Sequence, residues 1–230
     1  GNIPDFQRAL KPVHLNGGAA DGQTHEVVIW VTPDYLAIGS DQDFLRIPLT
    51  YPSATAIAET LGCVLPTRKM VDSIAVQSEV RLQPQPLPPG PQMRSSEYYL
   101  KHQQMIEKQR AGRPLGELIS GHKKDVVLTN RLYQKPGSIP IYGWHRLDDR
   151  PIQPLSTVHG ERYADYSHGI RLVSTTVWID GMLRVDDVTE RIGEILDVPA
   201  DRRVQIILPI GVPAAPGKQP EKLPFAERAW

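Results

Sequence analysis

Four of the seven histidines in this chain lie between Gly121 and Val173, and each has a glycine within two positions. Histidine exchanges protons near neutral pH and is the commonest side chain to bind metals through nitrogen. A neighbouring glycine permits a tight turn and the close approach of a ligand. Histidines gathered on short, turn-punctuated segments therefore predict one shared polar pocket, built from His122, His145, His159 and His168.

The segment VHGERYADYSHGIRLV, residues 158–173, holds the candidate catalytic groups. We expect His159 or His168 to act as general base, with Asp165 orienting the imidazole or supplying a carboxylate. Side chains alternate along a flat strand, so Asp165 and His168 would point to opposite faces unless a bulge or turn intervenes near Gly169. The alternative is a tight turn whose histidine only hydrogen-bonds to the backbone.

Basic and aromatic residues close to these histidines predict contacts with a ligand. The lysines after His122 could hold a carboxylate or phosphate and, with an arginine, stabilise developing negative charge. A tryptophan beside His145 could line a groove. The alternatives are a solvated loop that feeds a strand, and a tryptophan packed in the core. The expected ligand-binding residues are His122, Lys123, Lys124, Trp144, His145 and Arg171.

A metal centre is a variant of the same site. Its ligands would be His122, His159, His168 and Asp165, and zinc is the metal that these ligand types favour. The sequence holds no HExxH, CxxC, GxSxG or glycine-rich phosphate-binding motif. The one cysteine, Cys63, follows a predicted helix among apolar neighbours, so we expect a buried side chain rather than a nucleophile.

Composition excludes several classes of protein. Basic and acidic residues balance at 26 each, and no basic stripe suits nucleic acid as a partner. No apolar run approaches the roughly 18 residues that a membrane-spanning helix needs. The chain begins with GNIPDF, a start of the kind left when an export signal is removed. We therefore expect an exported protein, periplasmic or extracellular.

Local patterns predict an α+β fold with a mixed or antiparallel sheet, hairpins and a few packed helices. Residues 1–22 are expected to be an irregular lead-in. A single domain should span 23–208, with a proline-rich connector at 81–92, and 209–230 should form a proline-rich tail. Strands are expected at 24–32, 35–40, 44–49, 125–129, 139–144, 170–174, 176–179 and 204–208. Helices are expected at 53–61, from Thr67 onward, at 95–111 and at 185–196.

Two of these elements carry specific expectations. The strands at 24–32 and 35–40 could pair as a hairpin, and Asp180-Gly181 is a second hairpin signal. The helix capped by Thr67 should bury one face, formed by Met70, Val71, Ile74 and Ala75.

Three segments, GHKKDVV, IYGWH and DYSHGIRLV, together resemble a family of exported bacterial proteins of unassigned function, across most of residues 25–175. A local resemblance is to the YkuD-type L,D-transpeptidase signature, in which an upstream His-Gly precedes Ser-His-Gly-Cys and Ile/Val-Arg. His159-Gly160 and the run 167–171 match it in part. Ile170 stands where the cysteine would be, and the two His-Gly elements are closer together. The thiolate nucleophile of that chemistry is therefore missing.

Two function classes follow from these patterns. The first is a hydrolase that acts on an envelope or extracellular polymer through a His/Asp acid–base or metal centre. The second is a non-catalytic module that binds glycan or protein through Trp30, Trp144 and Trp178. The hydrolase hypothesis requires the four imidazoles to point into one cleft.

Overall fold

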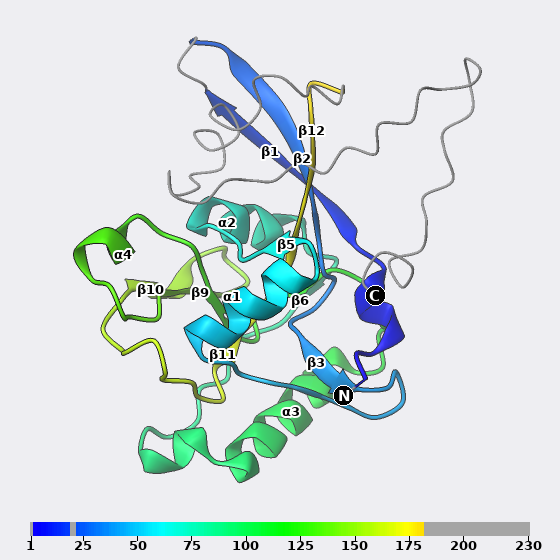
Figure 1. Cartoon of the computed structure of the whole chain (residues 1–230). Helices are drawn as coiled ribbons and strands as arrows, with labels where there is room; N and C mark the ends of the chain where they lie inside the picture. Colours follow the sequence, from blue (N-terminus) through cyan, green and yellow to red (C-terminus); the bar gives the residue numbers. More distant parts are fainter. Residues whose placement is uncertain (1, 19–21, 182–230) are drawn as a thin grey trace.

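A long antiparallel ribbon forms the first layer of the computed structural model, which describes residues 2–18 and 22–181. Strand β1 (Lys11–Gly18) pairs with β2 (Thr24–Val31) along its whole length. Strand β12 (Val173–Ile179) pairs with the other edge of β2 and with β5 (Cys63–Val64), in the order β1-β2-β12-β5. Figure 1 shows this ribbon standing out from the rest of the molecule.

The expected irregular lead-in at 1–22 is wrong, because a 3-10 helix, η1 (Asp5–Arg8), and β1 occupy much of it. Val13 and Leu15 are buried, while His14 and Asn16 are exposed, so β1 alternates as a half-buried strand does. Pro12 obscured the pattern, but proline is tolerated in a strand at the edge of a sheet, which is where β1 lies.

The second sheet carries most of the histidine-rich region. Its order is β10 (Pro151–Ser156), β9 (Ile141–His145), β8 (Lys124–Val126) and β11 (His168–Gly169). Strand β11 runs parallel to β8, whereas the other pairs are antiparallel. This register sets His168 directly beside Lys124.

Two short ladders complete the strands: β3 (Ala37–Gly39) with β4 (Phe44–Arg46), and β6 (Val80–Arg81) with β7 (Ile119–Ser120). The expected hairpin of 24–32 with 35–40 is wrong, because β3 pairs with β4 and β2 pairs with β1. The chain leaves β2 at a buried turn, where the Leu36 amide donates to the Ile170 carbonyl at 2.7 Å. That long-range bond directs β3 away from β2.

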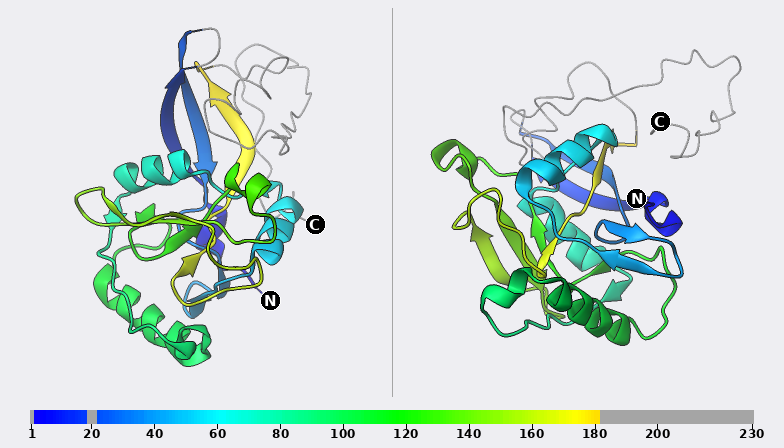
Figure 2. Two further views of the ribbon diagram at one scale, coloured as in Figure 1. Left: turned by 90° about the vertical axis from the view of Figure 1, so that its left-hand side faces the viewer. Right: turned by 60° about the horizontal axis from the view of Figure 1, so that its bottom comes forward.

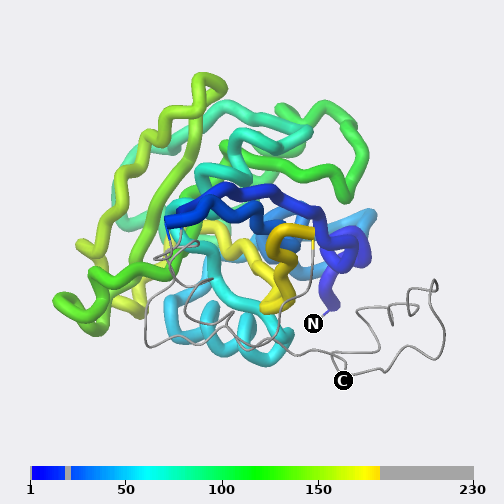
Figure 3. The backbone as a smooth tube through the Cα atoms, turned by 90° about the horizontal axis from the view of Figure 1, so that it is seen from above, coloured from blue at the N-terminus to red at the C-terminus, as the bar shows by residue number. Residues whose placement is uncertain are grey.

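The three long helices begin at hydroxyl caps, as predicted for Thr67 and Ser95, whereas the first begins earlier than the expected Ser53. Thr50 caps α1 (Tyr51–Thr60), Thr67 caps α2 (Arg68–Gln77), and Ser95 caps α3 (Ser96–Arg110). Two further helices consist of a single turn each, η2 (Pro91–Arg94) and α4 (Arg131–Gln134). Figure 2 shows α3 at the end of the molecule opposite the ribbon, and Figure 3 shows α1 and α2 on opposite sides of β1 and β2.

The chain therefore has the predicted α+β fold. Within the described ranges, no helix is both long and apolar enough to cross a membrane. The expected helix at 185–196, the strand at 204–208 and the tail at 209–230 lie outside the described residues. The proline-rich connector contains neither helix nor strand from 82 to 90.

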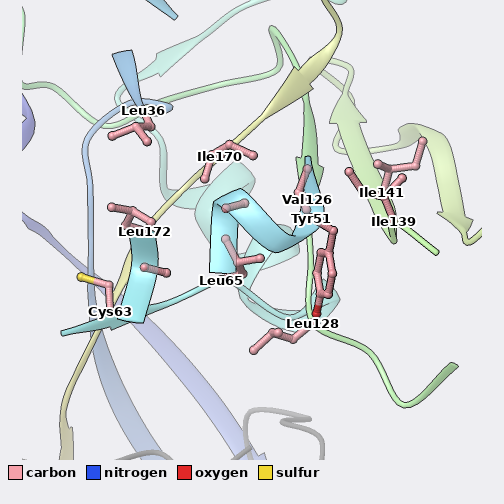
Figure 4. Packing of buried hydrophobic residues seen from close by; sticks show 12 residues of the cluster. Leu36, Tyr51, Cys63, Leu65, Val126, Leu128, Ile139, Ile141, Ile170 and Leu172 are labelled. Atoms are coloured by element: carbon pink, nitrogen blue, oxygen red, sulfur yellow. The ribbon is translucent and has the colours of Figure 1, made fainter. Parts of the chain in front are cut away.

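Two apolar clusters hold the layers together. The first packs α2 under the ribbon and includes Met70 and Ile74, as the sequence predicts. The second joins α1, β5, β8 and the segment after β11, and Figure 4 shows Leu65, Val126, Ile170 and Leu172 gathered there. Cys63 belongs to this cluster and is 3% exposed, as expected of a structural residue. Burial raises the pKa of its thiol to about 12, so it supplies no thiolate at neutral pH.

Candidate functional site

A tight turn between the loop at 158–164 and β11 brings two of the predicted catalytic groups together. The His168 amide donates to the Asp165 carbonyl at 3.0 Å, which closes the turn. The backbone amide and the hydroxyl of Ser167 both donate to Asp165 Oδ1, at 2.8 and 2.6 Å. The other carboxylate oxygen, Oδ2, lies 3.8 Å from His168 Nε2. The turn that an Asp165–His168 pair requires is therefore present.

His168 is a neutral imidazole held in the interior. Its side chain is 0% exposed, and neither ring nitrogen has a hydrogen-bond partner. Burial lowers the pKa of His168 to about 4, although the charge of Asp165 acts in the opposite direction. A buried imidazole with both nitrogens unpartnered is rare, since buried polar atoms usually pair. Both ring nitrogens therefore retain their hydrogen-bonding capacity, although the ring is not exposed to solvent.

Asp165 is an anion with several donors around it. Burial favours its neutral form, but the adjacent His168, two hydrogen bonds from Ser167 and one from Tyr163 outweigh this and lower its pKa. The carboxylate is therefore charged at neutral pH and can stabilise an imidazolium at His168.

Tyr163 links the buried and the exposed parts of the site. Its ring stacks on His159 with centroids 4.2 Å apart, and meets His168 edge-on at 5.7 Å. Its pKa rises to about 12, first because of burial and then because of Asp165. His159 is exposed and Tyr163 is half-buried. The two predicted general bases thus occupy one site, with His168 inside and His159 at its rim.

Two basic side chains flank this row of rings. The Arg94 guanidinium lies over the Tyr163 ring at 5.6 Å, and Lys124 Nζ lies over the Trp144 ring at 5.3 Å. Lys124 is half-buried, and burial lowers its pKa. Tyr99 stands nearby, and burial followed by the charge of Asp165 raises its pKa.

The other two histidines of the expected pocket lie elsewhere, so a pocket shared by all four imidazoles is wrong. His122 Nε2 contacts Asp34 Oδ1 at 3.0 Å in a fully buried charged network. His145 Nε2 contacts Asp72 of α2 at 3.0 Å. Each of these rings has a carboxylate partner from a distant part of the sequence, and that partner fixes its direction.

Three predicted ligand-binding residues are structural in this fold. Arg171 is 0% exposed and donates to the backbone carbonyls of Thr32, Pro33 and Ile119, so it cannot reach a substrate. Lys123 is buried and donates to the Tyr166 carbonyl at 2.6 Å. Trp144 is 4% exposed and packs in an aromatic cluster rather than along a groove. Among the predicted cations only Lys124 is half-buried rather than buried, and its strand lies directly beside His168.

The zinc hypothesis also requires correction. Among the residues that the structure describes, no three histidine, cysteine, aspartate or glutamate side chains gather as a metal site would require. The proposed ligand His122 pairs with Asp34 instead of approaching Asp165 and His168. The four expected zinc ligands therefore do not form one cluster in the described part of the chain.

Four residues around His168 are not among the site residues that the sequence predicts. Ser167 and Tyr163 lie inside the segment that the sequence singled out, but their bonds to Asp165 depend on the turn. Arg94 and Tyr99 come from the region around η2 and α3, far away in sequence, and no local pattern connects them with His168.

Gly169 has no side chain, so β11 passes close to Tyr35. This packing holds the neighbouring His168 in place. An alanine Cβ at Gly169 would lie 2.5 Å from Tyr35 Cδ1, and that ring is 2% exposed and cannot retreat. We expect Gly169→Ala to lower the free energy of unfolding by about 1–3 kcal/mol through overpacking. Urea denaturation measures this. Gly160→Ala is the matched control, because its Cβ would meet only the Gly137 carbonyl at 3.8 Å. Equal stability of the two variants would contradict the packing described.

Lowering the pH should destabilise the fold at pH values well above those at which ordinary carboxylates gain protons. Burial lowers the pKa of His102 to about 2 and those of His122 and His168 to about 4. Between pH 6.5 and 4 the unfolded chain binds these three protons and the folded chain does not, so stability is lost as pH falls. Asp125 acts oppositely, because burial raises its pKa to about 6 and the folded state gains that proton. The three histidines together outweigh Asp125, so the net effect of lowering the pH is a loss of stability.

We therefore expect the free energy of unfolding to fall by roughly 2–4 kcal/mol between pH 7 and pH 5. Urea titrations at the two pH values measure the change. His102→Phe removes one of these three protons and, since Asp125 offsets another, should flatten the net pH dependence by about half. Equal stability at both pH values would show that the three rings are not held neutral.

The sequence of this chain matches no protein family model and no curated protein, and its structure matches no solved structure. The assignment of function therefore depends on the residues around His168.

Proposed function

We propose that this protein is a hydrolase whose acid–base centre is the pair His168 and Asp165. The observation that supports it is the buried His168 ring, neutral at pH 7, with two unpartnered nitrogens and a charged carboxylate 3.8 Å from one of them. A carboxylate on one side of an imidazole orients it and stabilises its protonated form. Because Asp165 faces Nε2, Nδ1 is the nitrogen that accepts the proton.

The proposed reaction is the attack of water on an acyl or phosphoryl centre. His168 Nδ1 takes a proton from the water as its oxygen bonds to the electrophile, and Asp165 stabilises the resulting imidazolium. Lys124 offsets the negative charge that develops on the substrate oxygen. The bond to the leaving group then breaks, and His168 returns its proton to that group. A substrate reaches His168 by displacing the half-buried Tyr163.

The substrate that we propose is an envelope or extracellular polymer, with the protein exported to meet it. This part rests on the resemblance of the segments at 121–127, 141–145 and 165–173 to exported bacterial proteins. The cysteine of the transpeptidase signature is replaced by Ile170, which is 0% exposed in the core. Water, rather than a protein thiolate, is therefore the nucleophile of the proposal.

A screen of ester, phosphoester, glycoside and peptide substrates tests the proposal. The pH dependence of kcat/KM should then be level near neutrality and fall below about pH 4, where His168 gains a proton. An acid limb near pH 6.5 would assign the base to a solvent-exposed imidazole instead. The absence of turnover with every class would contradict the hydrolase.

The stacked rings at the rim favour a second function, that of a non-catalytic binding module. The planes of His159 and Tyr163 are 16° from parallel, and His159 is exposed, so the pair offers a flat surface to a planar or sugar-like group. Trp144 is buried and Trp30 and Trp178 lie on the ribbon, so the tryptophans do not form this surface. Saturable polymer binding that is lost in Tyr163→Ala, without turnover in any variant, would support this function.

A further inference from the structure

The row of side chains at the site carries unbalanced positive charge. Arg94 lies over one end, at Tyr163, and Lys124 lies beside His168 at the other end. Neither cation forms a salt bridge with a carboxylate among the described residues, although burial, which lowers the pKa of Lys124, is opposed by the charge of Asp165. The acidic group of the row, Asp165, is 2% exposed and already accepts hydrogen bonds from Ser167 and Tyr163. The cations at the site, Arg94, Lys124 and the buried Lys123, thus outnumber its one carboxylate, Asp165.

Two buried groups in the same row lack partners. Both His168 nitrogens are unpaired, as is the indole Nε1 of Trp144, over whose ring Lys124 lies. Buried polar atoms without partners are costly, and a ligand that completes their contacts removes that cost. An acceptor-rich, negatively charged group supplies what both the cations and the indole N–H lack.

We propose that Arg94 and Lys124 bind an anionic group, a carboxylate or a phosphate, next to the bond that His168 acts on. This deepens the proposed function by naming the substrate class, and it rests on that function only for the reaction. Arg94 presents a planar, multi-donor cation at the exposed rim, which suits a carboxylate or phosphate. Lys124 is deeper and lies near the reacting centre.

Aromatic anions are the probes for this site, because the exposed His159 offers them a ring to stack on. Benzoate, phenyl phosphate and the neutral benzamide are titrated into the protein, and the indole N–H signal of Trp144 is followed by NMR. We expect the anions to bind at least about tenfold more tightly than benzamide. Tighter binding of phenyl phosphate than of benzoate would assign a phosphate ligand, and tighter binding of benzoate would assign a carboxylate. Added salt should weaken the binding of both anions.

Variants decide which side chains are responsible. Arg94→Gln and Lys124→Gln should each weaken anion binding about tenfold and leave benzamide unchanged. Arg150→Gln is the matched control, because that arginine is exposed and paired with Asp148 at 2.8 Å. Benzamide binding as tightly as the anions, no binding of either anion, or unchanged binding in both variants would overturn the proposal. His168→Gln should keep anion binding, so loss of turnover without loss of binding separates this inference from the reaction.

Discussion

Replacing His168 with glutamine should lower kcat about 10²–10⁴-fold on any substrate that the wild-type protein turns over. Glutamine keeps a polar side chain in the buried position but accepts no proton near neutral pH. Asp165→Asn should also lower kcat, since it removes the charge that stabilises the imidazolium 3.8 Å away. Initial rates at saturating substrate measure both effects.

The control for this prediction lies on β9 of the same sheet. His145→Gln replaces a histidine that also contacts a carboxylate, Asp72, but stands outside the His168 row. It should retain kcat within a few-fold. If His145→Gln abolished turnover and His168→Gln did not, the acid–base pair would be His145 with Asp72 instead. Thermal unfolding of each variant checks that the fold survives the change.

Replacing Arg46 with methionine should lower the free energy of unfolding by about 3–5 kcal/mol. Arg46 is 1% exposed and donates through Nε and Nη2 to Asp34, at 2.5–3.0 Å, and through Nη1 to Glu107 at 2.7 Å. Methionine fills much of the volume but leaves the Asp34 carboxylate buried, with only His122 and nearby backbone as partners. A buried charge without its counterion is among the costliest defects in a protein interior.

Arg150→Met is the matched control, since it removes an arginine from an exposed pair and should change stability by less than about 1 kcal/mol. Arg46 also lowers the pKa of His122, so Arg46→Met should ease protonation of His122 and cost less at pH 5 than at pH 7. Equal and small losses in both arginine variants would mean that Arg46 does not hold the buried network together. Chemical denaturation of the wild-type protein and both variants at pH 7 and pH 5 measures these changes.

Local chemistry made much of the fold predictable from the sequence. Thr67 caps α2 and Ser95 caps α3 because a hydroxyl before a helix satisfies its free amides, and this signal lies within a few residues. Strand β1 was missed because Pro12 and two glycines interrupt an otherwise regular alternation. The partner of β3 was missed because the bond between Leu36 and Ile170 spans most of the domain.

The residues of the site likewise fall into two groups, those placed by local interactions and those placed by distant ones. Asp165 and His168 are three residues apart, so a turn was enough to join them, and the sequence indicated where the turn lies. Arg171 resembled a substrate cation, but its guanidinium binds carbonyls at Thr32 and Pro33, more than a hundred residues away. Pairings of this length set the direction of a buried side chain, and no local pattern records them.

The most direct test of this account is a pH titration of the His168 ring, followed by NMR in the wild-type protein and in Asp165→Asn. We expect a pKa of about 4 in the wild type and a lower pKa in the variant, because the Asp165 charge favours the imidazolium. That result would place a neutral, carboxylate-supported imidazole at the centre of the site. A His168 pKa near 6.5, unchanged by Asp165→Asn, would contradict it.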